Sequence, residues 1–188
     1  AAALSNKGRV LDNFKKYDEA IVCYDKALAI DPQLVDSLNF KGIALINLKK
    51  YEDAIVCYDD ALKIEPKYAD ALGNKGIALM ALQKYDEAIV CYDKALAIVP
   101  NEVVVLYNKG SLLNILKKYD EAIVCYDKAL AIDPNFHLIL VNKSFSLFNL
   151  KKYDESIVWC DKALEIDPNN ENVKKQRQLA VDSLKLTK

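Results

Sequence analysis

A stretch of 17 residues, KYDEAIVCYDKALAIDP, occurs twice without change in this chain, at residues 16–32 and 118–134. Near copies begin at Lys50, Lys84 and Lys152, so the first tyrosine of the stretch recurs every 34 residues. A fixed period of this size indicates a stacked array, in which each unit buries its apolar face against its neighbours. We therefore predict five repeats, at residues 1–34, 35–68, 69–102, 103–136 and 137–170.

Each repeat carries two helical patterns joined by a short polar turn. In both halves of repeat two, apolar residues recur mainly every three or four positions, as on one face of a helix. We expect the second helix to end near Glu65, because the proline that follows disfavours helical backbone at the residue before it. Connections this short place neighbouring helices antiparallel. The apolar positions are Leu38, Gly42, Leu45 and Leu48, and then Ala54, Ile55, Tyr58, Ala61, Leu62 and Ile64.

A common pattern of residue types marks the repeats. In repeat four, positions 4, 7, 8, 11, 20, 24, 27 and 32 hold Leu106, Lys109, Gly110, Leu113, Ala122, Tyr126, Ala129 and Pro134. The pattern resembles that of the tetratricopeptide repeat family. The resemblance implies an all-α fold, a right-handed α-solenoid superhelix of antiparallel helix pairs. We expect glycines such as Gly110 to face Ala122, so that the two helices of a repeat approach closely.

The end of the chain departs from this pattern. Repeat five has Ser144 for the glycine, Ser156 for the alanine, and Trp159-Cys160 where the other repeats have Cys-Tyr, which we interpret as adjustment at the end of a stack. The resemblance implies that residues 171–188 form a helix that caps the last open face. Its predicted inward stripe is Val173, Arg177, Ala180 and Leu184. Another departure is the lysine at position 7 of every repeat, whose stem we expect to lie on packed surface while its ammonium reaches water.

Candidate catalytic residues are sparse. The single histidine, His137, opens a predicted helix without a nucleophile or carboxylate partner, so we expect a surface role for it. Acidic pairs such as Asp120-Glu121 recur at helix starts, which favours helix capping over acid–base catalysis. Neither a Gly-rich phosphate loop nor a Cys/His cluster occurs. We predict no enzyme activity, no cofactor and no metal site.

Charges and cysteines indicate the kind of partner and compartment. Lys and Arg number 26 against 27 Asp and Glu, a net charge of -1, so no overall field attracts nucleic acid. Four of the five cysteines occupy the same point of the repeat, and we interpret all five as reduced, core-facing thiols, which suits a cytoplasmic location. No apolar run is long enough for a membrane span. We expect a protein or peptide ligand, no nucleic acid and no membrane span.

Variable positions of the first helices form the candidate binding site. In the family that the chain resembles, these helices line a concave groove, so the resemblance places positions 2, 5, 6, 9, 12 and 13 there. Position 6 is asparagine in four of five repeats, and an amide both donates to and accepts from an extended peptide backbone. Repeats four and five add apolar side chains, which are typical of peptide sites. The predicted peptide-binding residues are Asn39, Phe40, Asn74, Tyr107, Asn108, Ser111, Val141, Asn142 and Phe145.

Other interpretations stay open at this point. One is that the asparagines merely tolerate an exposed helix site; another is that some apolar residues, above all Val104 and Leu138, pack between repeats. A third is that the chain assembles into a homo-oligomer through a convex apolar stripe, made by the valine at position 22 of every repeat. These valines could equally pack against the next repeat in the ordinary way. In a fourth, the repeats are the recruiting arm of a larger enzyme.

Overall fold

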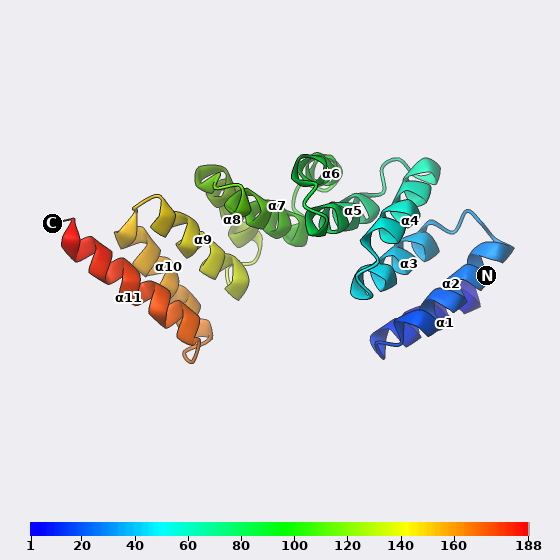
Figure 1. Cartoon of the computed structure of the whole chain (residues 1–188), viewed down its shortest axis with the longest axis horizontal. Coiled ribbons are helices and arrows are strands. Elements are labelled where there is room, and N and C mark those ends of the chain that lie inside the picture. The colour runs from blue at the N-terminus through cyan, green and yellow to red at the C-terminus, as the bar shows by residue number, and fades with distance from the viewer. Residues whose placement is uncertain (188) are drawn as a thin grey trace. The chain divides into compact units, whose positions relative to one another are not determined.

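The computed structural model describes residues 1–187, and this part of the chain holds eleven α-helices and no strand (Figure 1). The fold class predicted from the sequence, an all-α solenoid of antiparallel helix pairs, is confirmed. The second helix of repeat two ends at Ile64, next to the predicted Glu65. The helices are α1 (Ala2–Asn13), α2 (Tyr17–Ile30), α3 (Val35–Asn47), α4 (Tyr51–Ile64), α5 (Ala69–Ala81), α6 (Tyr85–Ile98), α7 (Val103–Ile115), α8 (Tyr119–Ile132), α9 (His137–Asn149), α10 (Tyr153–Ile166) and α11 (Glu171–Leu186).

The helices form two compact units. The first, Ala1–Pro100, holds α1 to α6, and the second begins at Asn101 and holds α7 to α11. Within each unit, every first helix packs on the second helix of its own repeat, and that second helix packs on the next first helix. Each unit therefore has a first-helix face, made by α1, α3 and α5 or by α7, α9 and α11. Its second-helix face is made by α2, α4 and α6 or by α8 and α10.

A tyrosine of the second helix fills the centre of each of the first four repeats. Tyr126 and its equivalents are 0% exposed. A Cβ atom on Gly110 would lie 2.5 Å from Cε1 of Tyr126, and Gly8, Gly42 and Gly76 show the same approach to their own tyrosines. The sequence predicted that these glycines face an alanine of the second helix, but the atoms nearest to a Cβ atom at each position belong to the tyrosine. Repeat five has Ser144 where a glycine was expected, and Cys160 stands where the tyrosine would be.

All five cysteines are buried and none forms a disulfide, as the sequence predicted. Burial raises the pKa of the Cys57 thiol to about 11. These side chains act as small apolar groups in the packing between helices.

The turn between the two helices of each repeat contains one residue with left-handed backbone. After α7, Lys117 has a φ of 59°. Its N–H donates to the carbonyl of Asn114, and the Lys118 N–H donates to the carbonyl of Leu113 at 2.8 Å. This pair of hydrogen bonds ends the helix in a Schellman motif, for which glycine is the usual residue. The same conformation recurs at Lys15, Lys49, Gln83 and Lys151.

The lysine at position 7 links successive repeats. Lys41 pairs with Asp25 at 2.6 Å, and Lys75 pairs with Asp59 at 2.5 Å. The expectation that this ammonium simply reaches water was incomplete, because it meets an aspartate from the preceding repeat. In the second unit Lys143 pairs with Asp127, and α11 continues the series with Arg177 and Asp161.

Candidate functional site

An exposed apolar surface lies on the first-helix face of the second unit. Val104 and Leu138 are 50% and 53% exposed, and Phe145 is 43% exposed. The alternative that Val104 and Leu138 are buried by packing between repeats is therefore wrong. Leu179 of α11 is also exposed, at 58%, and α11 packs against α9. Sequence reasoning missed Leu179, although it occupies position 9 when the repeat numbering is continued past residue 170.

The aromatic residues predicted for this face are held by other rings. The Phe145 ring meets the Tyr119 ring edge to face, with centroids 6.3 Å apart. The Tyr107 ring lies 5.8 Å from that of Phe136. Contacts of this kind stabilise ring orientation, so both side chains are positioned before any ligand arrives.

Two amides lie among these apolar groups with hydrogen-bonding capacity to spare. The side-chain Nδ2 of Asn142 donates to Ser111 Oγ at 3.5 Å. This contact is long, and it leaves the side-chain Oδ1 and the second N–H of the amide available. Asn108 is half-buried and makes no side-chain hydrogen bond within residues 101–187. Val141 lies beside Asn142 on α9 and is also half-buried.

Beneath the amides, Asn114 ties the two repeats of the second unit together. Its Nδ2 donates to the Tyr126 hydroxyl at 3.1 Å and to the Asn142 carbonyl at 3.3 Å. Its Oδ1 accepts from Ser146 Oγ at 2.6 Å. This network fixes the backbone that carries Asn142, and it was not expected from the sequence.

Two of the three residues predicted in the first unit, Asn39 and Asn74, contact each other. Asn39 is only 3% exposed, and its Oδ1 accepts from Asn74 Nδ2 at 3.0 Å. The Phe40 ring lies between the Tyr24 ring, at 6.3 Å, and the Arg9 guanidinium, at 4.8 Å. Asn39 thus orients Asn74, and the first-helix face of this unit is more polar than that of the second.

The buried tyrosine hydroxyls differ in whether they have a hydrogen-bond partner. The Tyr24 hydroxyl donates to Asp12 Oδ2 at 2.5 Å. Burial raises the pKa of Asp12, and this hydrogen bond opposes the rise. The hydroxyls of Tyr58 and Tyr92 have no hydrogen-bond partner among residues 1–187. An identical side chain in an equivalent place therefore carries a different energetic cost.

The acidic pairs do not cap helices by hydrogen bonding. Lysines such as Lys118 occupy the N-cap positions of the second helices, and none of them makes a capping side-chain bond. Asp120 and Glu121 lie two and three residues later, in the first turn. The expected capping role is therefore corrected to a charge interaction with the positive end of the helix dipole.

The predicted surface histidine and the possible metal ligands lie within residues 1–187. His137 is half-buried rather than at the surface, and its Nε2 atom has no partner within the described chain. Among residues 1–187, no three His, Cys, Asp or Glu side chains gather where they would hold a metal ion. In the same part of the chain, no helix has both the length and the apolar character needed to cross a membrane.

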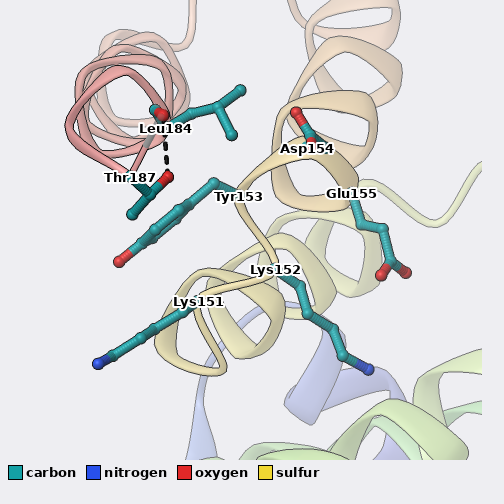
Figure 2. Close-up of a pocket in the computed structure, with 7 residues that line it drawn as sticks. All are labelled: Lys151, Lys152, Tyr153, Asp154, Glu155, Leu184 and Thr187. Carbon is teal, nitrogen blue, oxygen red and sulfur yellow. Dashed lines mark hydrogen bonds between the residues drawn. The ribbon is translucent and has the colours of Figure 1, made fainter.

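A cavity of about 310 Å³ lies between the turn before α10 and the end of α11. Figure 2 shows that its charged side chains, including Lys151, Lys152 and Glu155, point in different directions instead of converging on one point. The Thr187 hydroxyl donates to the Leu184 carbonyl at 2.9 Å. Without convergent polar groups, we assign this cavity no binding role.

Stacked antiparallel helix pairs joined by interrepeat ion pairs define an α-solenoid repeat protein. The chain belongs to the tetratricopeptide repeat family. The family's models match residues 1–34, 35–68, 69–102, 103–136 and 137–170. Repeats of this family generally serve protein interaction rather than catalysis.

Solved structures with the same fold support this assignment. The MamA protein is 23% identical, with a TM-score of 0.77 over 91% of this chain and 93% of that one. YrrB, described as a TPR protein with an unusual peptide-binding site, is 19% identical, with a TM-score of 0.76 over 93% and 90%. TTC0263, a TPR protein from Thermus thermophilus, is 19% identical, with a TM-score of 0.74 over 96% and 98%. No curated protein matches the sequence. At these identities the likeness shows the fold alone.

Proposed function

We propose that this protein is a non-catalytic interaction scaffold that binds an extended peptide segment on its first-helix face. The observation that carries the proposal is the row of exposed apolar side chains, Val104, Leu138 and Phe145, beside the underused amides of Asn108 and Asn142. Apolar side chains that stay in water without a partner mark interaction sites when they gather on one face. Amides among them provide the donors and acceptors that a peptide backbone needs.

Each predicted residue has a role in this proposal. Asn108 and Asn142 bind the peptide backbone, and Ser111 orients Asn142. Tyr107, Val141 and Phe145 receive apolar side chains of the peptide. In the first unit, Asn74 and Phe40 extend the site, with Asn39 holding the Asn74 amide.

Charge and similarity favour a protein ligand over a nucleic acid. The net charge of -1 gives no attraction for phosphates. The fold is shared with YrrB, whose description names a peptide-binding site. A cytoplasmic location, suggested by the five reduced thiols, stays a prediction.

The test selects peptides from a random display library with the full chain as the target and then measures the affinity of the selected peptides by titration. We expect Asn108→Ala combined with Asn142→Ala to weaken binding by about tenfold, at roughly 1 kcal/mol or less for each lost hydrogen bond. The melting temperature should stay nearly constant, because the Asn142 bond to Ser111 is long. The matched control is Asn135→Ala with Asn169→Ala, which removes two amides from exposed turns. Equal affinities of the two double variants would refute the proposal.

A second candidate function, self-assembly through the second-helix face, is favoured by one observation. The five valines at position 22 are 50% to 59% exposed, so ordinary packing against the next repeat is excluded for them. Sedimentation velocity at rising concentration tests this candidate. Association that Val56→Asp with Val90→Asp abolishes would support it, and a monomer at every concentration would remove it. The valines are Val22, Val56, Val90, Val124 and Val158.

A further inference from the structure

A cleft of about 310 Å³ opens on the second-helix face of the first unit, and side chains of α2, α3 and α4 line it. Leu45 and Cys57, both almost completely buried, belong to its lining. Val56, by contrast, is more than half exposed. The remaining lining residues are Ile21, Asp25, Lys41 and Asp53. The peptide site proposed above uses none of these residues.

The second unit shows what an occupant of such a cleft looks like. Three repeats later, the position of Cys57 is held by Trp159, the single tryptophan of the chain. The Lys143 ammonium lies 3.5 Å from the centre of the Trp159 ring, and Lys143 also pairs with Asp127. Lys143 and Asp127 correspond to Lys41 and Asp25, the ion pair that lines the cleft of the first unit.

The other lining positions correspond as well. Ile21, Leu45 and Val56 have Ile123, Leu147 and Val158 as counterparts, and Asp53 has another acid, Glu155. In the second unit, the indole of Trp159 therefore fits beside an ion pair and apolar residues of the same types as those that line the cleft. In the first unit, the small thiol of Cys57 leaves the corresponding space open. The ammonium over the ring face adds a cation–π attraction.

Asp53 gives the open cleft a preference among aromatic groups. Its exposed carboxylate makes no hydrogen bond or ion pair with residues 1–187 and lines the cleft. A carboxylate accepts the N–H of an indole, which a phenyl ring lacks. We propose that this cleft binds a tryptophan side chain presented by a partner protein, with Lys41 over the ring and Asp53 accepting the indole N–H.

A second copy of this chain does not fit that role. Its single tryptophan, Trp159, is half-buried and already engaged by Lys143 and by Lys162, whose ammonium lies 4.0 Å from the ring centre. Docking this side chain into another copy would break both contacts. The occupant is therefore a tryptophan from a different protein.

The test titrates the full chain with N-acetyl-L-tryptophanamide and follows backbone and methyl NMR signals. We expect saturable shifts at Ile21, Val56 and Cys57 with a dissociation constant in the millimolar range, which is ordinary for one small aromatic group. Cys57→Trp should fill the cleft and remove these shifts. Val56→Asp, at an exposed position, provides a second blocking variant if Cys57→Trp does not fold.

Two further arms examine the indole and the ion pair. Asp53→Ala, which removes the acceptor, should weaken binding of the tryptophan amide roughly fivefold, the effect of one hydrogen bond, and leave N-acetyl-L-phenylalaninamide unaffected. Trp159→Cys should create a second site in the second unit, with new shifts at Val158.

Four results would overturn the proposal. The first is no saturable shift at the cleft, and the second is equal binding by the blocked variants. The third is equal affinity for both amides, since the cleft would then be an unselective apolar site. Shifts at Val56 that grow with protein concentration alone would assign the cleft to a second copy instead.

Discussion

Two tyrosines in equivalent positions should respond oppositely to loss of the hydroxyl. Tyr126 and Tyr92 are both fully buried, but the Tyr126 hydroxyl accepts from Asn114 while the Tyr92 hydroxyl has no partner within residues 1–187. Tyr126→Phe should cost about 1 kcal/mol, because it removes a hydrogen bond and leaves Asn114 with one acceptor fewer. Tyr92→Phe should add about 1 kcal/mol, because a buried hydroxyl without a partner costs about 1 to 3 kcal/mol.

The measurement should be local, since repeat arrays need not unfold in a single step. Amide hydrogen exchange in α6 and α8 reports the stability of each repeat separately. A difference of about 2 kcal/mol between the variants corresponds to roughly 30-fold in the opening equilibrium. Met80→Asn is the complementary change, because it places beside Tyr92 the residue type that Asn114 provides beside Tyr126. Equal losses in both phenylalanine variants would show that Tyr92 has a partner, and the reasoning would fail.

Three further predictions follow from the packing and the turns. Gly110→Ser should destabilise the chain by about 1 to 3 kcal/mol, because the Cβ atom of the new serine meets the Tyr126 ring. The loss should be much smaller in a Tyr126→Cys background, and chemical denaturation of the single and double variants measures the difference. Burial raises the pKa of the Cys57 thiol from 9.0 to about 11, so this thiol should resist alkylation in the folded chain at pH 8. The contribution of the buried neutral thiol to stability should be complete below pH 9 and lost as the pH rises towards 11, and chemical denaturation at each pH measures this loss. Lys117→Gly should raise stability by a few tenths to about 1 kcal/mol, since φ is 59° there, and thermal unfolding with Lys118→Gly as the control tests this.

The fold was predictable because the period of the repeat is a long-range signal. Identical stretches at residues 16–32 and 118–134 require the same local structure, and alternating helical patterns with short turns leave an antiparallel pair as the arrangement. Exposed residues of the first helices were also predictable in kind, as Phe145 shows. Both inferences need only the position of a residue within its own repeat.

Contacts between repeats were not predictable in the same way. The pairing of Lys41 with Asp25 joins position 7 of one repeat to position 25 of the one before, and no pattern within a single repeat identifies that partner. Asn39 shows the same limit, because its burial depends on Asn74 in the next repeat. Among the residues predicted for the second unit, Phe145 is exposed, whereas Asn142 is half-buried and already donates to Ser111. Their role in binding a peptide stays a prediction.

The second helices give the clearest case of structure that local sequence leaves undetermined. Helices α2, α6 and α8 have one and the same sequence, YDEAIVCYDKALAI, and each buries its tyrosine completely. The hydroxyl of that tyrosine nevertheless donates to Asp12 in the first repeat, accepts from Asn114 in the fourth and has no partner within the described chain in the third. Position 12 of the facing first helix sets the outcome. Variation in the first helices therefore decides both which side chains line the proposed peptide site and whether the buried tyrosine hydroxyls find partners. A substitution at position 12 of a first helix should therefore also change the stability of the repeat that carries it.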